Sequence, residues 1–144
     1  MERAVLRTLD ANANRAREGL RVLEDVARFV LDDASLAAEA KSLRHAVTRE
    51  ADALRAPAGA SHAARDSEGD VGRPGMTEGE GRRSALGDLV LANARRAEEA
   101  LRVLEEFSKL SDRSAASRLK DLRYSVYTLE QRIVDAVAGR GESG

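Results

Sequence analysis

The 144-residue chain contains no cysteine and no tryptophan, and it has two histidines, His45 and His62. Without cysteine, neither a disulfide framework nor a thiolate metal site can form, and two histidines are too few for a histidine-rich zinc site. Aromatic residues make up 3% of the chain, which argues against a surface that stacks nucleic-acid bases.

Net charge and long apolar runs are also scarce. The formal net charge is −1, so no overall field draws the protein to nucleic acid or to an anionic membrane. No apolar run approaches the roughly 18 residues of a membrane span, and no signal peptide opens the chain. We therefore expect a cytoplasmic protein with neither nucleic acid nor membrane as a partner. With 42% hydrophobic and 34% charged residues, the chain should form one folded domain.

Proline and glycine are concentrated in one segment. Residues 56–81 hold both prolines and more than half of the eleven glycines, and they show no periodicity, which predicts a long irregular loop. Elsewhere apolar residues recur at helical spacing. The spacing predicts four helices. The first ends near residue 31, and the other three cover about 34–54, 77–109 and 114–137. Thr77 and Glu80 have the spacing of a capping box, and residues 139–144 should form a flexible tail after a single domain at 1–138.

The chain is an internal repeat. Residues 11–25 and 92–106 are identical at eleven of fifteen positions, and KSLRHAV at 41–47 matches KDLRYSV at 120–126. Repeat 1 (about 2–55) and repeat 2 (about 82–138) are thus two copies of a helical hairpin. One hairpin cannot bury its apolar stripe, whereas two packed together can. The sequence therefore predicts an all-α, antiparallel four-helix bundle with approximate twofold symmetry, and a homodimer of such bundles is compatible with it.

The repeat preserves polar residues as well as apolar ones. One stripe of the first helix carries charges at ion-pair spacing and is interpreted as a solvated face. Its residues are Asn14, Glu18, Arg21 and Asp25, and their counterparts in the second repeat are Arg95, Glu99, Arg102 and Glu106. A second set flanks the core stripe, where it could satisfy backbone groups or hold an anion between helices: Asn12 and Arg15 are matched by Asn93 and Arg96. Gly19, in the same flank, indicates either a close helix contact or room for a ligand.

The loop contains the sequence AARDSEGDVG at residues 63–72. It combines the charged residues Arg65, Asp66 and Asp70 with two glycines, Gly69 and Gly72. Glycines let backbone N–H groups approach a phosphate, and carboxylates can hold Mg²⁺. A Gly/Asp turn without a ligand is the commoner use of such residues, and the spacing matches neither an EF-hand nor a Walker A motif.

Five segments occur in a specific order: DANANRAREGLRVLEDVARFVLDD, LRHAV, AARDSEGDVG, ANARRAEEALRVLEEFSK and LRYSVYTLE. Together they resemble the alternative, all-helical family of hydroxymethylpyrimidine phosphate kinases of thiamine biosynthesis, over roughly residues 6–132. That family is often fused in front of thiamine-phosphate synthase. The resemblance implies phosphorylation of 4-amino-5-hydroxymethyl-2-methylpyrimidine phosphate to the diphosphate, with ATP as co-substrate, Mg²⁺ as cofactor and thiamine-phosphate synthase as a partner.

The residue roles follow from the chemistry of that reaction. A phosphate monoester, with a second pKa of about 6, is mostly dianionic at neutral pH, so the task is to bring two anions together rather than to supply a strong base. We hypothesise four catalytic phosphate clamps, namely Arg15, Arg21, Arg96 and Arg102. The hypothesised metal ligands are Asp66, Asp70, Glu24 and Glu105. The hypothesised substrate-binding residues are Asn12, Glu18, Arg44, Arg65, Gly69, Gly72, Asn93, Glu99 and Arg123.

In this hypothesis one repeat serves the nucleotide and the other the pyrimidine phosphate. Two other classes of function remain open. One is a non-catalytic helical module associated with thiamine-phosphate synthase. The other is an all-α, Mg²⁺-dependent nucleotide pyrophosphatase, for which the adjacent carboxylates at 24–25 and 105–106 would be suitable.

Overall fold

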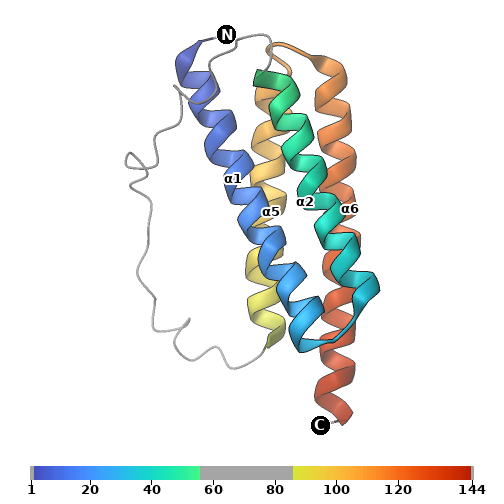
Figure 1. Ribbon diagram of the computed structural model, residues 1–144. Helices are drawn as coiled ribbons and strands as arrows, with labels where there is room; N and C mark the ends of the chain where they lie inside the picture. Colours follow the sequence, from blue (N-terminus) through green and yellow to red (C-terminus); the bar gives the residue numbers. More distant parts are fainter. Residues whose placement is uncertain (1, 56–85, 144) are drawn as a thin grey trace, which may run out of the picture.

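The computed structural model describes residues 2–55 and 86–143, with side chains as far as Arg140. The described chain is helical and contains no strand, which confirms the predicted fold class (Figure 1). Its elements are α1 (Arg3–Asp25), the π-helical turn η1 (Val26–Val30), α2 (Ala34–Arg55), α5 (Leu86–Ser108) and α6 (Arg113–Ser143).

The helices form a bundle in which neighbours run antiparallel. Helix α1 packs against α2 and α5, and α6 packs against α5 and α2, so α1 and α6 lie diagonally opposite (Figure 1). The hairpin α1–α2 and the hairpin α5–α6 are related by an approximate twofold axis between them, because α1 corresponds to α5 and α2 to α6. Helix α2 ends and α5 begins at opposite ends of the bundle. The predicted four-helix bundle of two hairpins is confirmed.

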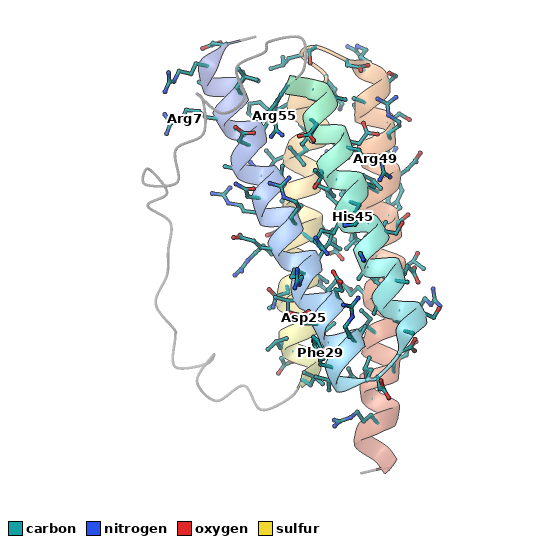
Figure 2. All side chains as sticks on the ribbon, viewed as in Figure 1. Arg7, Asp25, Phe29, His45, Arg49 and Arg55 are labelled. Carbon is teal, nitrogen blue, oxygen red and sulfur yellow. The ribbon has the colours of Figure 1, made fainter. Side chains whose placement is uncertain are left out.

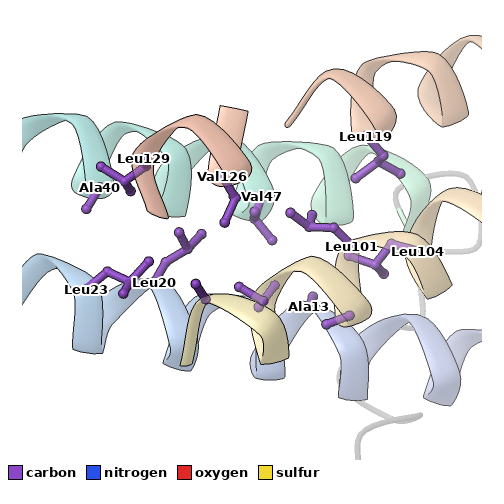
Figure 3. Close-up of a cluster of buried hydrophobic side chains, with 14 of the residues drawn as sticks. Ala13, Leu20, Leu23, Ala40, Val47, Leu101, Leu104, Leu119, Val126 and Leu129 are labelled. Atoms are coloured by element: carbon purple, nitrogen blue, oxygen red, sulfur yellow. The ribbon is translucent and has the colours of Figure 1, made fainter. Parts of the chain in front are cut away.

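The apolar stripes of all four helices meet along the bundle axis (Figure 3). Each stripe follows the helical period of the sequence, which is why the core could be located from the pattern alone. A fully buried leucine contributes about 1.5–3 kcal/mol to stability. The fully buried Leu, Val and Ile side chains include Leu20 and Leu23 of α1, Val47 of α2, Leu101 and Leu104 of α5, and Leu119, Val126, Leu129 and Ile133 of α6.

Helices α1 and α5 approach each other most closely at Gly19. A Cβ atom at this position would lie 2.6 Å from the backbone oxygen of Asn93 and 3.2 Å from the Cβ atom of Ala97. Glycine is therefore required by backbone contact between the two helices, in spite of its unfavourable helix propensity. Of the two interpretations of Gly19, the structure supports the close helix contact and not room for a ligand.

The two hairpins differ in the length of their turns. The repeat offset is 92 − 11 = 81 in the first helices and 120 − 41 = 79 in the second, so the first hairpin has two additional residues between its helices. The turn η1 absorbs them: the N–H of Leu31 donates to the oxygen of Val26, 2.9 Å away and five residues earlier. Asp32 then adopts a positive φ of 52°, and Oδ1 of Asp33 accepts the N–H of Leu36 at 3.0 Å. This confirms the predicted end of the first helix near residue 31, and Asp33 caps the helix that follows.

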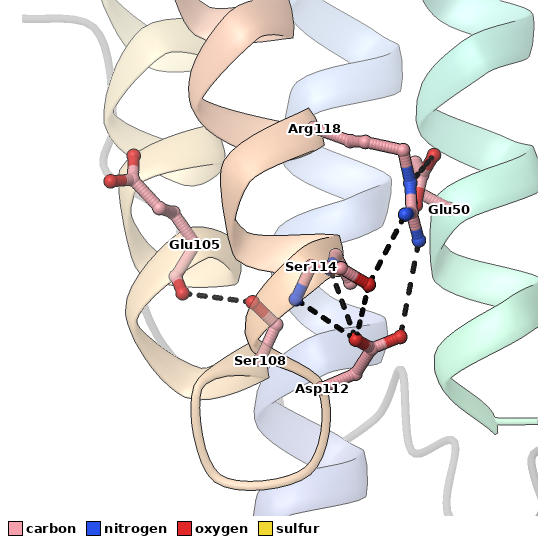
Figure 4. Close-up of polar contacts among 7 residues, drawn as sticks. Glu50, Glu105, Ser108, Asp112, Ser114 and Arg118 are labelled. Carbon is pink, nitrogen blue, oxygen red and sulfur yellow. Dashed lines mark hydrogen bonds and ion pairs between the residues drawn. The ribbon is translucent and has the colours of Figure 1, made fainter.

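The second hairpin uses a shorter turn with the same kind of cap. Oδ1 of Asp112 accepts the backbone N–H of Ser114 at 3.0 Å and that of Ala115 at 3.2 Å. Close to this cap, Arg118 of α6 forms an ion pair with Glu50 of α2 at 2.9 Å (Figure 4). Both hairpins therefore begin their second helix with an aspartate N-cap.

One helix boundary differs from the sequence prediction, and two predicted features cannot be compared with the structure. Helix α6 continues through residues 139–143, which the sequence assigned to a flexible tail. The loop at 56–81 and the helix start near Thr77 fall on residues outside the described part of the chain. No helix among the described residues is long and apolar enough to span a membrane.

Candidate functional site

Each hairpin contains one buried glutamate that is held by an arginine of its second helix. Oε1 of Glu24 accepts hydrogen bonds from Nε and Nη2 of Arg44 at 3.0 and 2.9 Å. Oε1 of Glu105 accepts the equivalent bonds from Arg123 at 3.2 and 3.0 Å. Both glutamates are buried. The repeated Glu and Arg thus first explain how each hairpin closes, because two N–H groups of one guanidinium donate charge-assisted hydrogen bonds to an oxygen of the buried carboxylate.

The metal role predicted for Glu24 and Glu105 would require a cation beside the arginine that is already paired with each carboxylate. The same ion pairs show that Arg44 and Arg123, predicted to bind substrate, are engaged within the protein. Among the described residues, no three His, Cys, Asp or Glu side chains gather into a metal site. The remaining loop candidates lie outside the described residues: Arg65, Asp66, Gly69, Asp70 and Gly72.

Arg21 and Arg102 lie on the solvated face predicted for their stripe. The Arg21 side chain is 60% exposed and pairs with Asp25 at 3.4 Å, and the Arg102 side chain is 59% exposed and pairs with Glu106 at 3.2 Å. Both pairs join residues four apart on one helix, the arrangement of weak surface ion pairs. Nothing brings these two arginines toward the facing helix.

Asn12 and Asn93 are anchored to their own helices. The Asn12 side-chain amide is buried and donates to the backbone oxygen of Thr8 at 2.9 Å, and Asn93 donates to that of Leu89 at 2.9 Å. These bonds are the backbone-satisfying role that the sequence left open for both residues. Oδ1 of Asn12 also accepts a long bond, 3.4 Å, from Nη1 of Arg15.

Arg15 and Arg96 occupy the outer groove between α1 and α5. Gly19 packs against the Asn93–Ala97 turn of an antiparallel helix. Arg15 therefore lies at the same height along the bundle axis as Glu99, and Glu18 lies at the same height as Arg96. All four side chains are exposed. Within residues 2–55 and 86–143 no ion pair involves any of them. The structure therefore brings four of the predicted site residues to the same side of α1 and α5.

The structure also reveals a buried acid pair that the sequence analysis missed. Glu98 of α5 is 3% exposed and hydrogen-bonds to Glu130 of α6. Burial, followed by the hydrogen bond and charge of Glu130, raises the pKa of Glu98 to about 8. Arg95 covers the pair from the solvent side, with its Nε atom 3.4 Å from Glu130 and 3.7 Å from Glu98. Glu98 therefore keeps its proton at neutral pH, because two facing carboxylates cannot both ionise at low cost.

The signal that could have revealed this pair is a break in the repeat. Glu98 stands where the first hairpin has Arg17, and Glu130 stands where it has Ala51. Next to them, Tyr127 replaces Thr48, the residue whose hydroxyl Arg17 reaches at 3.5 Å. Three neighbouring positions thus change together, whereas the adjoining Glu–Arg ion pair is present in both hairpins.

A second departure from symmetry lies at the end of the first hairpin. Arg55, labelled in Figure 2, lies at the end of α2. It forms an ion pair with buried Asp10 of α1. The second hairpin has Leu91 and Val134 at these positions. Arg55 also pairs with exposed Asp52, so the charge of Asp10 is compensated within the fold.

Comparison with known proteins places the chain in a family. The sequence pattern of the ThiD2 family matches residues 7–132. The chain belongs to the ThiD2 family. Its similarity extends over most of both hairpins and the segment between them, in agreement with the extent of the resemblance found in the sequence.

Several relatives are called thiamine-phosphate synthase. The protein of that name from Nostoc punctiforme is 44% identical over 135 residues, which are 93% of this chain and 36% of the relative. The one from Synechocystis is 46% identical over 132 residues, 91% of this chain and 36% of the relative. The chain thus spans about a third of the length of the relatives it matches, and no solved structure matches it.

Proposed function

We propose that this chain acts in thiamine biosynthesis as a helical module that works with thiamine-phosphate synthase, either in one polypeptide or bound to it. The observation that carries the proposal is the match to relatives of that name, which aligns 93% of this chain with 36% of the relative from Nostoc. A bundle with its own complete core can fold as a separate unit beside a larger partner.

An exchange experiment tests the module. In a bacterial strain that depends on the Synechocystis relative for thiamine, the matching third of that protein is deleted, and this chain is then supplied either fused in its place or as a separate protein. Deletion should abolish growth without thiamine, and this chain should restore it. Growth after deletion alone, or failure of a folded fusion to restore it, would contradict the proposal.

A more specific proposal is that the module is the hydroxymethylpyrimidine phosphate kinase implied by the resemblance. It is supported by Arg15 and Arg96, two repeat-matched arginines that are exposed and lack an ion pair within the described chain. Each lies beside an anchored asparagine in the groove between α1 and α5. Arginine forks are suited to holding phosphate oxygens, and phosphoryl transfer depends mainly on such positioning and charge neutralisation.

The kinase proposal is tested by incubating the protein with ATP, Mg²⁺ and hydroxymethylpyrimidine phosphate. The pyrimidine diphosphate and ADP are measured by mass spectrometry, and the unphosphorylated alcohol serves as a parallel acceptor. Formation of the diphosphate, with an inert alcohol, is the expected result because an arginine site demands an anion. Intact ATP with a folded protein would refute the kinase while leaving the module proposal in place.

The carboxylates named for the pyrophosphatase alternative are all engaged in ion pairs with arginines. The alternative rested on adjacent carboxylates at 24–25 and 105–106 as open ligands. Glu24 and Glu105 are buried and bound by arginines, whereas Asp25 and Glu106 lie on the solvated face and pair with arginines of their own helices.

A further inference from the structure

The two repeat-matched arginines on the shared side of α1 and α5 are held differently. Nη1 of Arg15 donates to Oδ1 of Asn12 at 3.4 Å. Arg96 stands at the same spacing from Asn93, but within residues 2–55 and 86–143 it makes no hydrogen bond to that amide. The repeat therefore places two arginines alike, while the described side chains orient only Arg15.

The Asn12 side chain is itself fixed. It is 6% exposed, and its Nδ2 group donates to the backbone oxygen of Thr8 at 2.9 Å. An amide has its donor and its acceptor on opposite branches, so this bond also fixes the direction of Oδ1, which faces Arg15. Asn93 makes the same bond to Leu89 but is less buried. The backbone of α1 thus sets the direction of the oxygen that holds Arg15.

The acceptor that holds Arg15 is neutral. By contrast, Arg44, Arg55 and Arg123 are paired with buried carboxylates, which offset their charge. An amide oxygen orients a guanidinium but leaves its charge uncompensated. Ordering a long side chain beforehand also lowers the entropic cost of binding a ligand. Asn12 therefore keeps Arg15 in one orientation with its full positive charge, which is what a phosphate site needs.

Arg17 also bonds to neutral side chains, but in a different setting. It donates to Oδ1 of Asn14 and, at 3.5 Å, to the hydroxyl of Thr48 on α2. Its position in the second repeat is occupied by Glu98, so it has no arginine counterpart. Arg17 is thus tied into the first hairpin, whereas Arg15 is held and exposed.

We propose that Asn12 is a positioning residue, which holds the guanidinium of Arg15 ready for a phosphate group without neutralising it. Arg96, which is not held, is ordered only by the ligand itself. The first repeat then supplies a preformed phosphate contact and the second an adaptable one, although their sequences match. The phosphate part rests on the kinase proposal, whereas the ordering of Arg15 by Asn12 does not.

The ordering is measured without any activity, from NMR relaxation of the arginine Nε–H signals. Arg15→Lys and Arg96→Lys each remove one signal and so assign it. Arg15 should be more ordered than Arg96. The near-isosteric Asn12→Leu should lower the order of Arg15 to that of Arg96, and the matched control Asn93→Leu should leave Arg96 as it is. Equal order of the two arginines in the wild type, or an Arg15 unaffected by Asn12→Leu, overturns the proposal.

Kinetics separate positioning from a merely structural role. Asn12→Leu should raise the KM of one substrate about fivefold with little change in kcat, and this loss should vanish in an Arg15→Ala background. Asn12→Asp keeps the acceptor and the order of Arg15 but adds a negative charge, so it should raise the same KM at least about tenfold. A loss that Asn12→Leu adds in full to Arg15→Ala, or a fully active Asn12→Asp enzyme, contradicts the role.

This proposal and the kinase proposal can fail separately. If the folded protein forms no diphosphate, the kinase is refuted, and inorganic pyrophosphate is titrated while the arginine signals are followed. Arg15 should then respond at a lower concentration than Arg96, and Asn12→Leu should remove this difference. An Arg15 signal that stays unchanged at millimolar pyrophosphate would refute the phosphate site itself.

Discussion

The two hairpins share their core and one buried ion pair, but they differ in how the rest of their buried charge is compensated. In the first hairpin, Arg17 and Arg55 provide cations at the α1–α2 interface. In the second, the equivalent of Arg17 is Glu98, which faces another acid. The shared features are those that any such hairpin needs in order to fold. The differences therefore mark the positions at which the two hairpins are not equivalent.

The largest expected effect comes from removing the arginine of each shared ion pair. Glu24 also receives Arg28 at 3.2 Å, whereas the equivalent Lys109 pairs with Glu106, so Arg123 alone holds Glu105. Arg123→Met should cost about 3–5 kcal/mol by leaving a buried charge unpaired. Arg44→Met should cost less, about 1–3 kcal/mol, because Arg28 remains. Urea unfolding measures both.

The controls for these variants use the same two helices. Arg102→Met removes an exposed pair and should change stability by less than about 0.5 kcal/mol. The double variant Glu105→Met/Arg123→Met should recover much of the lost stability, because it leaves no buried charge behind. Equal losses for Arg44→Met and Arg123→Met would show that Arg28 does not compensate Glu24.

The second prediction asks whether the hairpins contribute different parts of a kinase. Arg96→Ala should lower kcat/KM about 100-fold, equivalent to about 2.7 kcal/mol, without a comparable loss of stability, since Arg96 is exposed. If each repeat serves one substrate, Arg15→Ala and Arg96→Ala should raise the KM of different substrates. Steady-state kinetics with ATP and the pyrimidine phosphate varied separately distinguish the two cases.

The matched controls here are Arg21→Ala and Arg102→Ala, which remove repeated arginines of the solvated face. They should change kcat/KM less than about threefold. A fully active Arg96→Ala enzyme would remove the groove between α1 and α5 from the kinase proposal.

The third prediction concerns pH. The pKa of Glu98 is raised to about 8 in the folded protein, so the folded state keeps a proton that the unfolded chain loses above about pH 4.5. Its contribution to stability is complete below that pH and is lost progressively as pH rises through 8, by up to about 1.4 kcal/mol per pH unit. At pH 8.5, the Glu98→Gln variant should therefore be more stable than the wild type.

Thermal or urea unfolding between pH 5 and pH 9 measures this effect. The neutral Glu98→Gln variant should show a flatter profile, since Glu130, Arg95 and Glu99 are the charged groups that face position 98. A profile unchanged by the substitution would mean that Glu98 is ionised in the fold, and that the acid pair does not share a proton.

The smallest expected effect comes from the contact between α1 and α5. Gly19→Ala should gain up to about 1 kcal/mol of helix propensity but lose more through the clash with the backbone oxygen of Asn93, for a net loss of about 1 kcal/mol. Gly139→Ala, at a helical position with no neighbour within 4 Å, should be stabilising or neutral. A stabilising Gly19→Ala would show that the two helices can separate without cost.

Much of the fold could be predicted because its causes are local. Leu20, Leu23 and Leu101 recur at helical spacing, and aspartates stand where the second helices begin. The candidate site was less accessible to prediction. Glu18 and Glu24 carry the same side chain six residues apart on one helix, yet Glu18 is exposed and Glu24 is buried against Arg44. Helical spacing alone does not say which flank of a core stripe will meet a neighbouring helix.

The sequence by itself therefore determined the helices, the repeated hairpin and the bundle, since periodicity, breaks and duplication are properties of a linear chain. Only the tertiary structure decided which charges are buried and with what partners. The arrangement of α1 between α2 and α5 assigns Glu24 to an arginine and leaves Arg15 exposed, and the packing of α5 on α6 brings Glu98 to Glu130. The physical reason is that the energy of a charge depends on its solvation and its neighbours, which are fixed when helices distant in sequence pack together.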